Sequence, residues 1–388
     1  GVFVSKIFHN SGFGPLNEVK VVDMATVVAG PGVGKYFADF GADVIKVERP
    51  DGDSTRGMGW KVDGEKDSLW WKLVNRGKRS LILDLKNKDD LDRFLVLIKE
   101  ADLLIENLRP GKLESLGLEP SRLLTLNPRL VILRVTGFGQ NGPYSQKPGF
   151  ATIAEALSGL SSLMGEPEGG PLLPPIALTD EVTALAGSFA AMMGIFHARN
   201  SGHGQVIDVN LLETVLQILG PLPAAWDSLK YLQPRLGSSI PYSIPRGTYM
   251  SADGQWLALS ASADSVAQRL IETMNGKLDA KFTTFQSRIE NRIELEELTR
   301  EWISKHKADE VIEILNKADA AVAPVQSMDR VVDDPHILQR KSLIKVENVL
   351  MQNVVAHMSK TPGQIRSAGP KLGADNESIR HDIDETFA

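Results

Sequence analysis

The sequence of 388 residues contains no cysteine. This absence excludes disulfide bonds, thiolate metal sites and a cysteine nucleophile. It also fits a reducing compartment, so we expect a cytoplasmic protein. Histidine is scarce, with seven residues, and the sequence has no His-x-His or His-Glu-x-x-His pair. We therefore expect no metal site.

Neither sign of charge dominates, because 43 basic and 49 acidic side chains leave a net charge of −6. A nucleic-acid or anionic-membrane surface is therefore not expected. No apolar run approaches the length of a membrane span, and no internal repeat is visible. Hydrophobic content of 42% and charged content of 24% are ordinary for a globular enzyme, and 388 residues suit two domains. The first residues lack both an initiator methionine and a signal-peptide pattern, so we leave them out of the fold prediction.

The first half of the chain predicts a parallel sheet. Residues 19–24, rich in valine, have the composition of a strand, and so do residues 43–48. Between them a Gly-x-Gly-x-Gly run opens a helix that ends near Gly41. A strand, glycine turn, helix and second strand form a βαβ unit, which places the chain in the α/β class.

Three interpretations compete for this glycine turn. A dinucleotide site would use Glu48 at the end of the second strand, but Lys35 stands where the third glycine belongs. A phosphate-binding P-loop is a near miss, because Ala29 replaces its first glycine and Tyr36 its magnesium-binding hydroxyl. The third interpretation, close packing of helix on strand, is favoured, so no nicotinamide cofactor is expected.

Further elements are predicted by hydrophobic spacing and turn signals. In the first half we expect strands at 102–106 and 130–135 and helices at 89–101, 121–126 and 152–164. In the second half we expect a hairpin at 247–260 and helices at 265–274, 293–305 and 308–318.

Asp180 occupies an unusual position. It follows the short apolar run Ile176–Leu178, which we expect to be a strand, and it precedes a helix over Ala184–Ala198 with almost no charge. Thr179 or Asp180 could simply cap that helix. A helix without charge is expected to be buried, however, and an aspartate at its mouth sits where a substrate reaches.

Basic residues follow the predicted strands at several places. As a set they favour an anionic ligand, because ligands of open α/β sheets bind outside the carboxyl ends of the strands. The set comprises Arg49, Arg56, Arg76, Lys78, Arg79 and Lys86.

Four separated motifs stand in order along the chain: LNEVKVVDMATVVAGPGVGKYFADFGADVIKVERPDGDSTRG, ENLRPGKLESLGLEP, ALTDEVTALAG with GIFHARNSGHGQVIDVNLLE, and VAPVQSMDRVVDDPHILQRKSLIKVEN. Together they resemble one family, the class III CoA-transferases, which also contains the α-methylacyl-CoA racemases. The resemblance covers the chain from Leu16 onward. It implies a Rossmann-like large domain that carries CoA, a smaller α+β domain, and an interlocked homodimer. The implied limits are 16–210 for the large domain, 211–237 for a linker, 238–335 for the small domain and 336–388 for the return to the large one.

The resemblance also implies site residues. Asp180 matches the catalytic carboxylate. The positions implied to contact CoA are Val28, Ala29, Arg49, Leu83, Lys86, Asn107, Leu108, Arg109, Lys112 and Lys147. Ser115 stands where some members have a CoA-binding arginine, so Lys112 or Arg109 would replace it.

The implied function is transfer of CoA from an acyl-CoA to a free carboxylic acid through an anhydride and an aspartyl-CoA thioester. Oxyanion donors are expected from residues 137–139 or 165–170. A racemase and a non-catalytic acyl-CoA-binding protein are the alternatives. The racemases carry Gly-His-Asp where this chain has Gly149, Phe150 and Ala151, which argues against proton transfer. The acceptor acid stays open, with Arg246 a candidate partner for its carboxylate.

Overall fold

The computed structural model describes residues 4–261 and 263–387, which form two compact units. The large unit contains the chain up to Ser158, Pro174–Gly220 and the chain from Pro335 onward. The small unit contains Gly159–Leu173 and Pro221–Asp334. The stretch expected as a linker, 211–237, contains two helices, of which α9 (Leu211–Ile218) lies in the large unit and α10 (Leu222–Leu229) in the small one.

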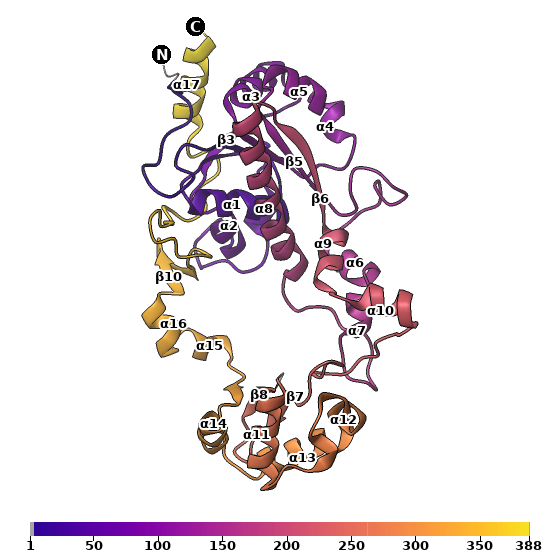
Figure 1. The fold of residues 1–388 in the computed structure, drawn as a ribbon. Helices are drawn as coiled ribbons and strands as arrows, with labels where there is room; N and C mark the ends of the chain where they lie inside the picture. The colour runs from indigo at the N-terminus through magenta and orange to yellow at the C-terminus, as the bar shows by residue number, and fades with distance from the viewer. Residues whose placement is uncertain (1–3, 262, 388) are drawn as a thin grey trace. The chain divides into compact units, whose positions relative to one another are not determined.

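A six-stranded parallel sheet organises the large unit, as the α/β prediction expected (Figure 1). The strands lie in the order β3-β2-β1-β4-β5-β6. Their bounds are β1 Lys20–Asp23, β2 Asp43–Glu48, β3 Arg79–Ile82, β4 Leu103–Glu106, β5 Val131–Thr136 and β6 Gln205–Asn210. Strands β1, β2 and β4 are almost wholly buried, which explains why consecutive apolar residues occur in each of them without alternation.

Helices cover both faces of this sheet. On one face α1 (Ala29–Asp39) packs on α8 (Leu178–Ser201), and on the other α3 (Lys88–Glu100) packs with α5 and α17. The remaining elements of the large unit are α2 Leu69–Val74, α4 Lys112–Ser115, α5 Pro120–Leu126, α6 Ala151–Leu157, α9 Leu211–Ile218, α16 Pro335–Arg340, β10 Leu343–Val346, β11 Val349–Gln352 and α17 Asn376–Phe387.

The small unit is an antiparallel sheet, β7-β8-β9, with helices packed on it. The expected hairpin is present, with β7 at Arg246–Met250 and β8 at Trp256–Ser260. The other elements are α7 Leu160–Leu163, α10 Leu222–Leu229, α11 Asp264–Asn275, α12 Phe285–Glu290, α13 Arg292–Ser304, α14 Ala308–Lys317, β9 Ala321–Pro324 and α15 Met328–Val331. A separate core of apolar side chains holds this unit together.

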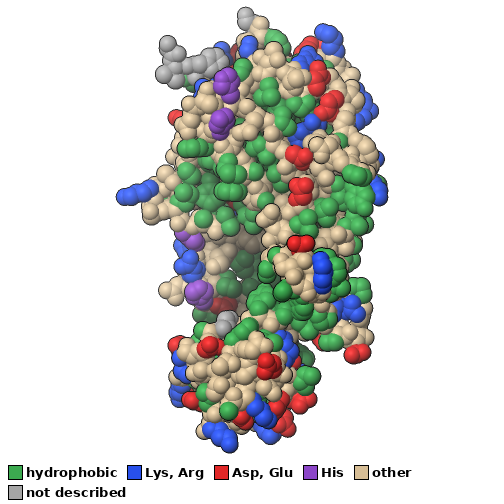
Figure 2. Space-filling view, turned by 45° about the vertical axis from the view of Figure 1, so that its right-hand side comes forward, with side chains coloured by type: hydrophobic (Ala, Val, Ile, Leu, Met, Phe, Trp, Pro, Cys, Tyr) green, Lys and Arg blue, Asp and Glu red, His purple; other side chains and the backbone are tan. Residues whose placement is uncertain are grey.

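Helix α8 differs from its prediction in two respects. It begins at Leu178, so the residues expected to form a short strand before it do not, and Ile176 is 70% exposed. The helix is also only half buried, because it turns its small residues to the protein and exposes Phe189 and Phe196, at 68% and 70%. Hydrophobic side chains lie at the surface in many places on one face of the molecule (Figure 2).

By length and composition α8 is apolar enough to cross a membrane, so the prediction that no apolar run approaches that length is wrong for this helix. A core helix passes the same test, and α8 packs on α1, β5, β6 and α9. Close packing explains its small residues, since a Cβ built on Gly32 of α1 would lie 2.7 Å from the Ala184 Cβ. The glycine turn therefore serves the packing role favoured by the sequence.

The segment before β1, which the fold prediction left out, is part of the core. Ile7 and Phe8 are buried in the same cluster as Ile379 and Ile383 of α17. Backbone and side-chain hydrogen bonds hold the segment in place, including one from the His9 N–H to the Asp43 carboxylate at 2.7 Å.

Most of the basic set expected near an anionic ligand is instead paired inside the protein. The Arg76 guanidinium binds Asp39 through two hydrogen bonds of 2.8 and 3.0 Å, and both side chains are buried. Arg56 binds Glu48 in the same two-point manner, which leaves Glu48 without the role that a dinucleotide site would give it. The expectation of ligand contact is wrong for these two arginines because each is bonded to an internal carboxylate.

Lys78 and Arg79 are also engaged within the fold. Lys78 donates to Asp23 at 2.7 Å and is fully buried, whereas Arg79 binds Asp43 at 2.6 Å. Of the basic set, Arg49 and Lys86 thus stay at the protein surface. A position at a strand end therefore does not show whether a basic side chain binds a ligand or pairs with an internal carboxylate.

We predict that replacing Arg76 with methionine strongly destabilises the large unit. The substitution leaves the buried Asp39 carboxylate without its partner, and breaking a buried ion pair from one side costs about 3–5 kcal/mol. Urea unfolding followed by circular dichroism measures the loss. The exposed pair of Lys88 and Asp92 supplies the control, since Lys88→Met should leave the unfolding midpoint nearly unchanged. Equal midpoints for the two variants would contradict the prediction.

Candidate active site

In the turn between β1 and α1, each backbone N–H and carbonyl group from Ala25 to Val27 forms a hydrogen bond with a side chain. Lys46 donates to the Ala25 carbonyl, and the Ala25 N–H donates to Asp23 at 3.0 Å. The Val27 N–H donates to Asp53 at 3.3 Å, and the Val27 carbonyl accepts from the Thr55 hydroxyl at 3.1 Å. These contacts hold the valine at φ 71°, in the left-handed region that a β-branched residue rarely adopts.

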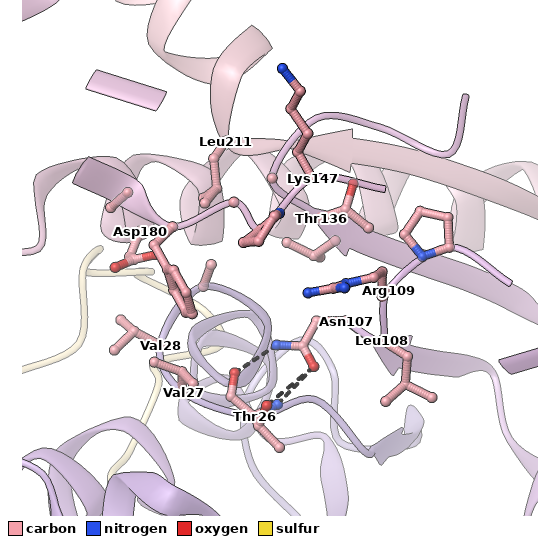
Figure 3. Close-up of a pocket in the computed structure, with 18 of the residues that line it drawn as sticks. Thr26, Val27, Val28, Asn107, Leu108, Arg109, Thr136, Lys147, Asp180 and Leu211 are labelled. Carbon is pink, nitrogen blue, oxygen red and sulfur yellow. Dashed lines mark hydrogen bonds between the residues drawn. The ribbon is translucent and has the colours of Figure 1, made fainter. Parts of the chain in front are cut away.

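Asn107 completes this arrangement from the end of β4. Its amide oxygen accepts from the Thr26 N–H at 3.0 Å, and its amide nitrogen donates to the Thr26 carbonyl at 2.7 Å. Both amide atoms are therefore used to fix the turn (Figure 3). Contact of Asn107 with CoA, implied by the resemblance, stays a prediction for this residue.

A cavity of about 390 Å³ lies at this turn, outside the carboxyl ends of β1, β4 and β5. Val28 and Ala29 line it from the start of α1, and Asp180 lines it from α8. Helix α1 has no side-chain cap and no acidic residue in its first turn. Its N-terminus, which carries partial positive charge, therefore borders the same cavity as the Asp180 carboxylate.

The Asp180 carboxyl group lies in the first turn of α8. Its pKa is raised to about 6, mainly by burial and to a smaller extent by the negative charges of Glu181 and Glu155. Asp180 does not cap the helix, as one interpretation proposed: the N-cap is Ala177, which makes no side-chain cap bond. Asp180 instead lines the cavity.

Two glycines bring the loop after β5 over the cavity. A Cβ built on Gly137 would lie 2.7 Å from the Cα of Gly149, and one on Gly149 would lie 2.8 Å from the Cα of Gly137. This approach of two backbones leaves no room for a side chain at either position. It places Phe150 and Ala151 in the cavity wall together with Asp180.

Two cations from separate loops also line the cavity. Arg109 extends into it from the side opposite Asp180, whereas the Lys147 ammonium points away (Figure 3). Lys147 instead lies over the Tyr144 ring at 4.1 Å from its centroid. Of the two, Arg109 presents its positive charge to whatever fills the cavity.

A second cavity, of about 380 Å³, adjoins the first, and Thr26 and Leu108 line both. Arg49, Leu83, Lys86 and Lys112 line it from the ends of β2 and β3 and from the start of α4. Its polar lining includes three cations on exposed side chains, which suits a phosphate-bearing ligand.

The structure brings all the residues named by the resemblance to these two cavities. Val28, Ala29, Asn107, Leu108, Arg109, Lys147 and Asp180 line the first. Arg49, Leu83, Leu108, Lys86 and Lys112 line the second. Sequence reasoning missed Thr26 and Thr136, which also line the first cavity, because a lone threonine at a strand end carries no motif signal. Residues 165–170, one proposed source of oxyanion donors, belong to the small unit, whereas Gly137 lines the first cavity.

A comparison with known families identifies this arrangement. The model of CoA-transferase family III matches residues 16–376. The chain belongs to CoA-transferase family III. The family resemblance inferred from the motifs is thereby confirmed, and so is the prediction of an enzyme, a class III CoA-transferase.

Characterised relatives of this family III chain cover nearly its full length. It is 36% identical to the succinyl-CoA–L-malate CoA-transferase beta subunit of Chloroflexus aurantiacus, over 95% of this chain and 94% of that one. It is 34% identical to the succinyl-CoA–D-citramalate CoA-transferase of the same organism, over the same shares. A solved CAIB/BAIF family protein from Brucella suis superimposes with a TM-score of 0.85 at 30% identity, covering 96% of this chain and all of that one. The family III fold is therefore shared along the chain.

We predict an acid limb in the pH dependence of the transfer reaction of this family III chain. The resemblance implies that the Asp180 carboxylate attacks the thioester. A carboxylate attacks only when ionised, and the pKa of Asp180 is raised to about 6. The value of kcat/KM should therefore be constant above pH 7 and fall about tenfold per pH unit below pH 5. Initial rates between pH 4.5 and 8 measure it, with circular dichroism as the control for folding. A rate that stays constant down to pH 5 would contradict an Asp180 pKa near 6.

Proposed function

We propose that this chain transfers CoA from a dicarboxylic acyl-CoA to a free dicarboxylic acid, with Asp180 as the covalent nucleophile. The observation that carries the proposal is the cavity that Asp180, with its raised pKa, lines together with the N-terminus of α1 and Arg109. The substrate class comes from the relatives, whose names pair succinyl-CoA with L-malate and D-citramalate. It agrees with a cationic side chain reaching into the cavity.

In this proposal CoA spans both cavities. Its phosphates lie among Arg49, Lys86 and Lys112, because cations hold phosphate oxygens through charge-assisted hydrogen bonds. Its pantetheine arm passes Thr26 and Leu108, which line both cavities, and its thioester reaches Asp180. The fixed turn from Ala25 to Val27 keeps this path open without rearrangement on binding.

The proposed reaction proceeds in two matched halves. The Asp180 carboxylate attacks the thioester carbonyl of the donor, and CoA leaves as a thiolate, which gives a mixed anhydride. The thiolate then attacks the Asp180 carbonyl, which releases the donor acid and leaves an aspartyl-CoA thioester. The acceptor acid repeats both steps in reverse. The oxyanion of each tetrahedral intermediate would be stabilised by N–H groups at the start of α1 or near Gly137.

We predict that incubation with succinyl-CoA labels Asp180. The thioester and anhydride react with hydroxylamine and borohydride, so peptide mapping by mass spectrometry locates the modified carboxyl group. Asp180→Ala should abolish both label and transfer, whereas Asp227→Ala, a surface change in the small unit, should preserve them. A label on another carboxylate would refute the assignment. CoA binding without label or transfer would favour the alternative of a non-catalytic acyl-CoA-binding protein.

A racemase is the other alternative, and the cavity wall argues against it. Racemisation needs two proton carriers on opposite faces of the α-carbon, and Phe150 and Ala151 occupy the wall where the racemases carry histidine and aspartate. We therefore predict no exchange of the α-proton when a 2-methylacyl-CoA is incubated with the protein in D₂O and followed by NMR. Deuterium uptake at the rate of turnover would overturn this prediction.

We further propose a homodimer. Its support in this chain is the exposed apolar face of α8, where Leu185, Phe189, Met193 and Phe196 recur at helical spacing. Light scattering at micromolar concentration should give twice the mass of the chain, and an active monomer would refute it. The cytoplasmic location expected from the lack of cysteine stays a prediction.

A further inference from the structure

Glu155 is a buried acid that the proposed reaction does not use. It lies on α6 with only 3% of its surface exposed. Its carboxylate accepts one hydrogen bond, from the Thr179 hydroxyl at 2.7 Å, and Thr179 is fully buried. Within residues 4–261 and 263–387 no basic side chain forms an ion pair with Glu155. Burying a carboxylate with a single hydroxyl partner is unfavourable, so its presence calls for a reason.

The position of Glu155 supplies that reason. Thr179 immediately precedes Asp180 in the first turn of α8, and α6 packs on α8 at this point. The hydrogen bond therefore fixes the helical turn that carries Asp180. It also holds the negative charge of Glu155 at this turn. The charge of Glu155 also raises the pKa of Asp180, although its effect is smaller than those of burial and of Glu181.

Other charged groups at this turn do not cancel the effect. Glu181 lies next to Asp180 and accepts from the Tyr36 hydroxyl of α1 at 3.5 Å, and its charge acts on Asp180 in the same direction as that of Glu155. Lys35 of α1 is buried, and Asp39, Arg76 and Glu181 are the charges that act on it. On α9 the group facing this turn is the neutral Thr214 hydroxyl, 2.6 Å from that of Thr183.

We propose that Glu155, held by Thr179, is a positioning residue whose buried charge favours the covalent state of Asp180 over its free carboxylate. The inference rests on the proposed function. In the first half-reaction an enzyme carboxylate and an acyl-CoA become an aspartyl-CoA thioester and a free acid, so the negative charge leaves Asp180 with the acid. Repulsion between Glu155 and Asp180 exists only before this step. Its relief shifts the equilibrium of the half-reaction toward the thioester.

The experiment measures that equilibrium directly. The whole protein is incubated with succinyl-CoA and a range of succinate concentrations at pH 8, and intact-protein mass spectrometry gives the ratio of thioester to free enzyme. Glu155→Gln removes the charge and keeps an oxygen that can accept from Thr179. We expect this variant to lower the ratio about two- to fivefold at every succinate concentration, since one pKa unit corresponds to a tenfold change and Glu155 is the smallest of the three causes of the Asp180 shift.

Two Thr179 variants separate charge from structure. Thr179→Val removes the hydrogen bond that holds the Glu155 side chain at this turn. The charge is then no longer fixed beside Asp180, so the ratio of thioester to free enzyme should fall toward that of Glu155→Gln. Thr179→Ser keeps the hydroxyl and should match the wild type, as should Glu18→Gln, which removes an exposed charge.

The outcomes are distinct. A wild-type protein that forms no thioester with succinyl-CoA would refute both the proposed function and this inference. A wild-type protein that forms it, with Glu155→Gln giving an equal ratio and an equal pH dependence, would overturn the inference alone. If circular dichroism shows that Glu155→Gln does not fold, a wild-type ratio of thioester to free enzyme in Thr179→Val overturns the inference instead.

Discussion

The interaction on which the site depends is a group of buried charges beneath the β1–α1 turn. Lys46 and Lys78, from β2 and the residue before β3, meet Asp23 at the end of β1, and Lys46 also pairs with Asp53 at 3.2 Å. Each partner is hydrogen-bonded further, which is the condition under which a buried ion pair is tolerated. Burial lowers the pKa of Lys78 to about 8, although Asp23 opposes the shift. Apolar residues in place of these charged side chains could still form a stable sheet. They would not supply the hydrogen bonds that Lys46, Asp23 and Asp53 form with the backbone of the turn.

The turn matters because both cavities meet there. Its backbone is fixed by charges and amides below it and not by the ligand above it, so the start of α1 faces the cavity before any substrate arrives. Helix α1 can lie close to α8 because Gly32 gives room to Ala184, and this packing brings Asp180 to the same cavity. The nucleophile and the helix N-terminus are thus positioned by one rigid assembly.

The sequence analysis predicted the four central strands β2, β1, β4 and β5, because each contains a short apolar run between clear turn signals, but it did not list the edge strands β3 and β6. It failed where a residue type has two roles. Arg76 and Lys86 look equally suited to bind phosphate, yet one lies inside the fold and the other at the surface, and only tertiary contacts decide between them. The helix that carries Asp180 was expected to be buried because it lacks charge. Some of its apolar side chains, such as Phe189, are exposed, and composition alone does not distinguish an exposed apolar face from a buried one.

The site residues were found through motifs, whereas their supports were not. Glu155 and Thr179 lie 24 positions apart, and no spacing rule connects them. Asn107 stood in a recognised motif, but its amide holds Thr26 through contacts that no local pattern reveals. Groups that hold other groups are specified by three-dimensional packing, so they are the part of a site that a single sequence predicts least.

The edge of the sheet at β3 has a consequence for how the chain must fold. Its outer N–H groups donate to Asp375 and Asn376, nearly 300 residues further along, and the Ile82 carbonyl accepts from Arg380. Until the C-terminal segment has been synthesised, this strand exposes an open edge on which another strand can pair. Contacts of such sequence separation also slow folding, because a long loop must close before they form. During synthesis the sheet therefore has one unprotected edge until α17 docks on it.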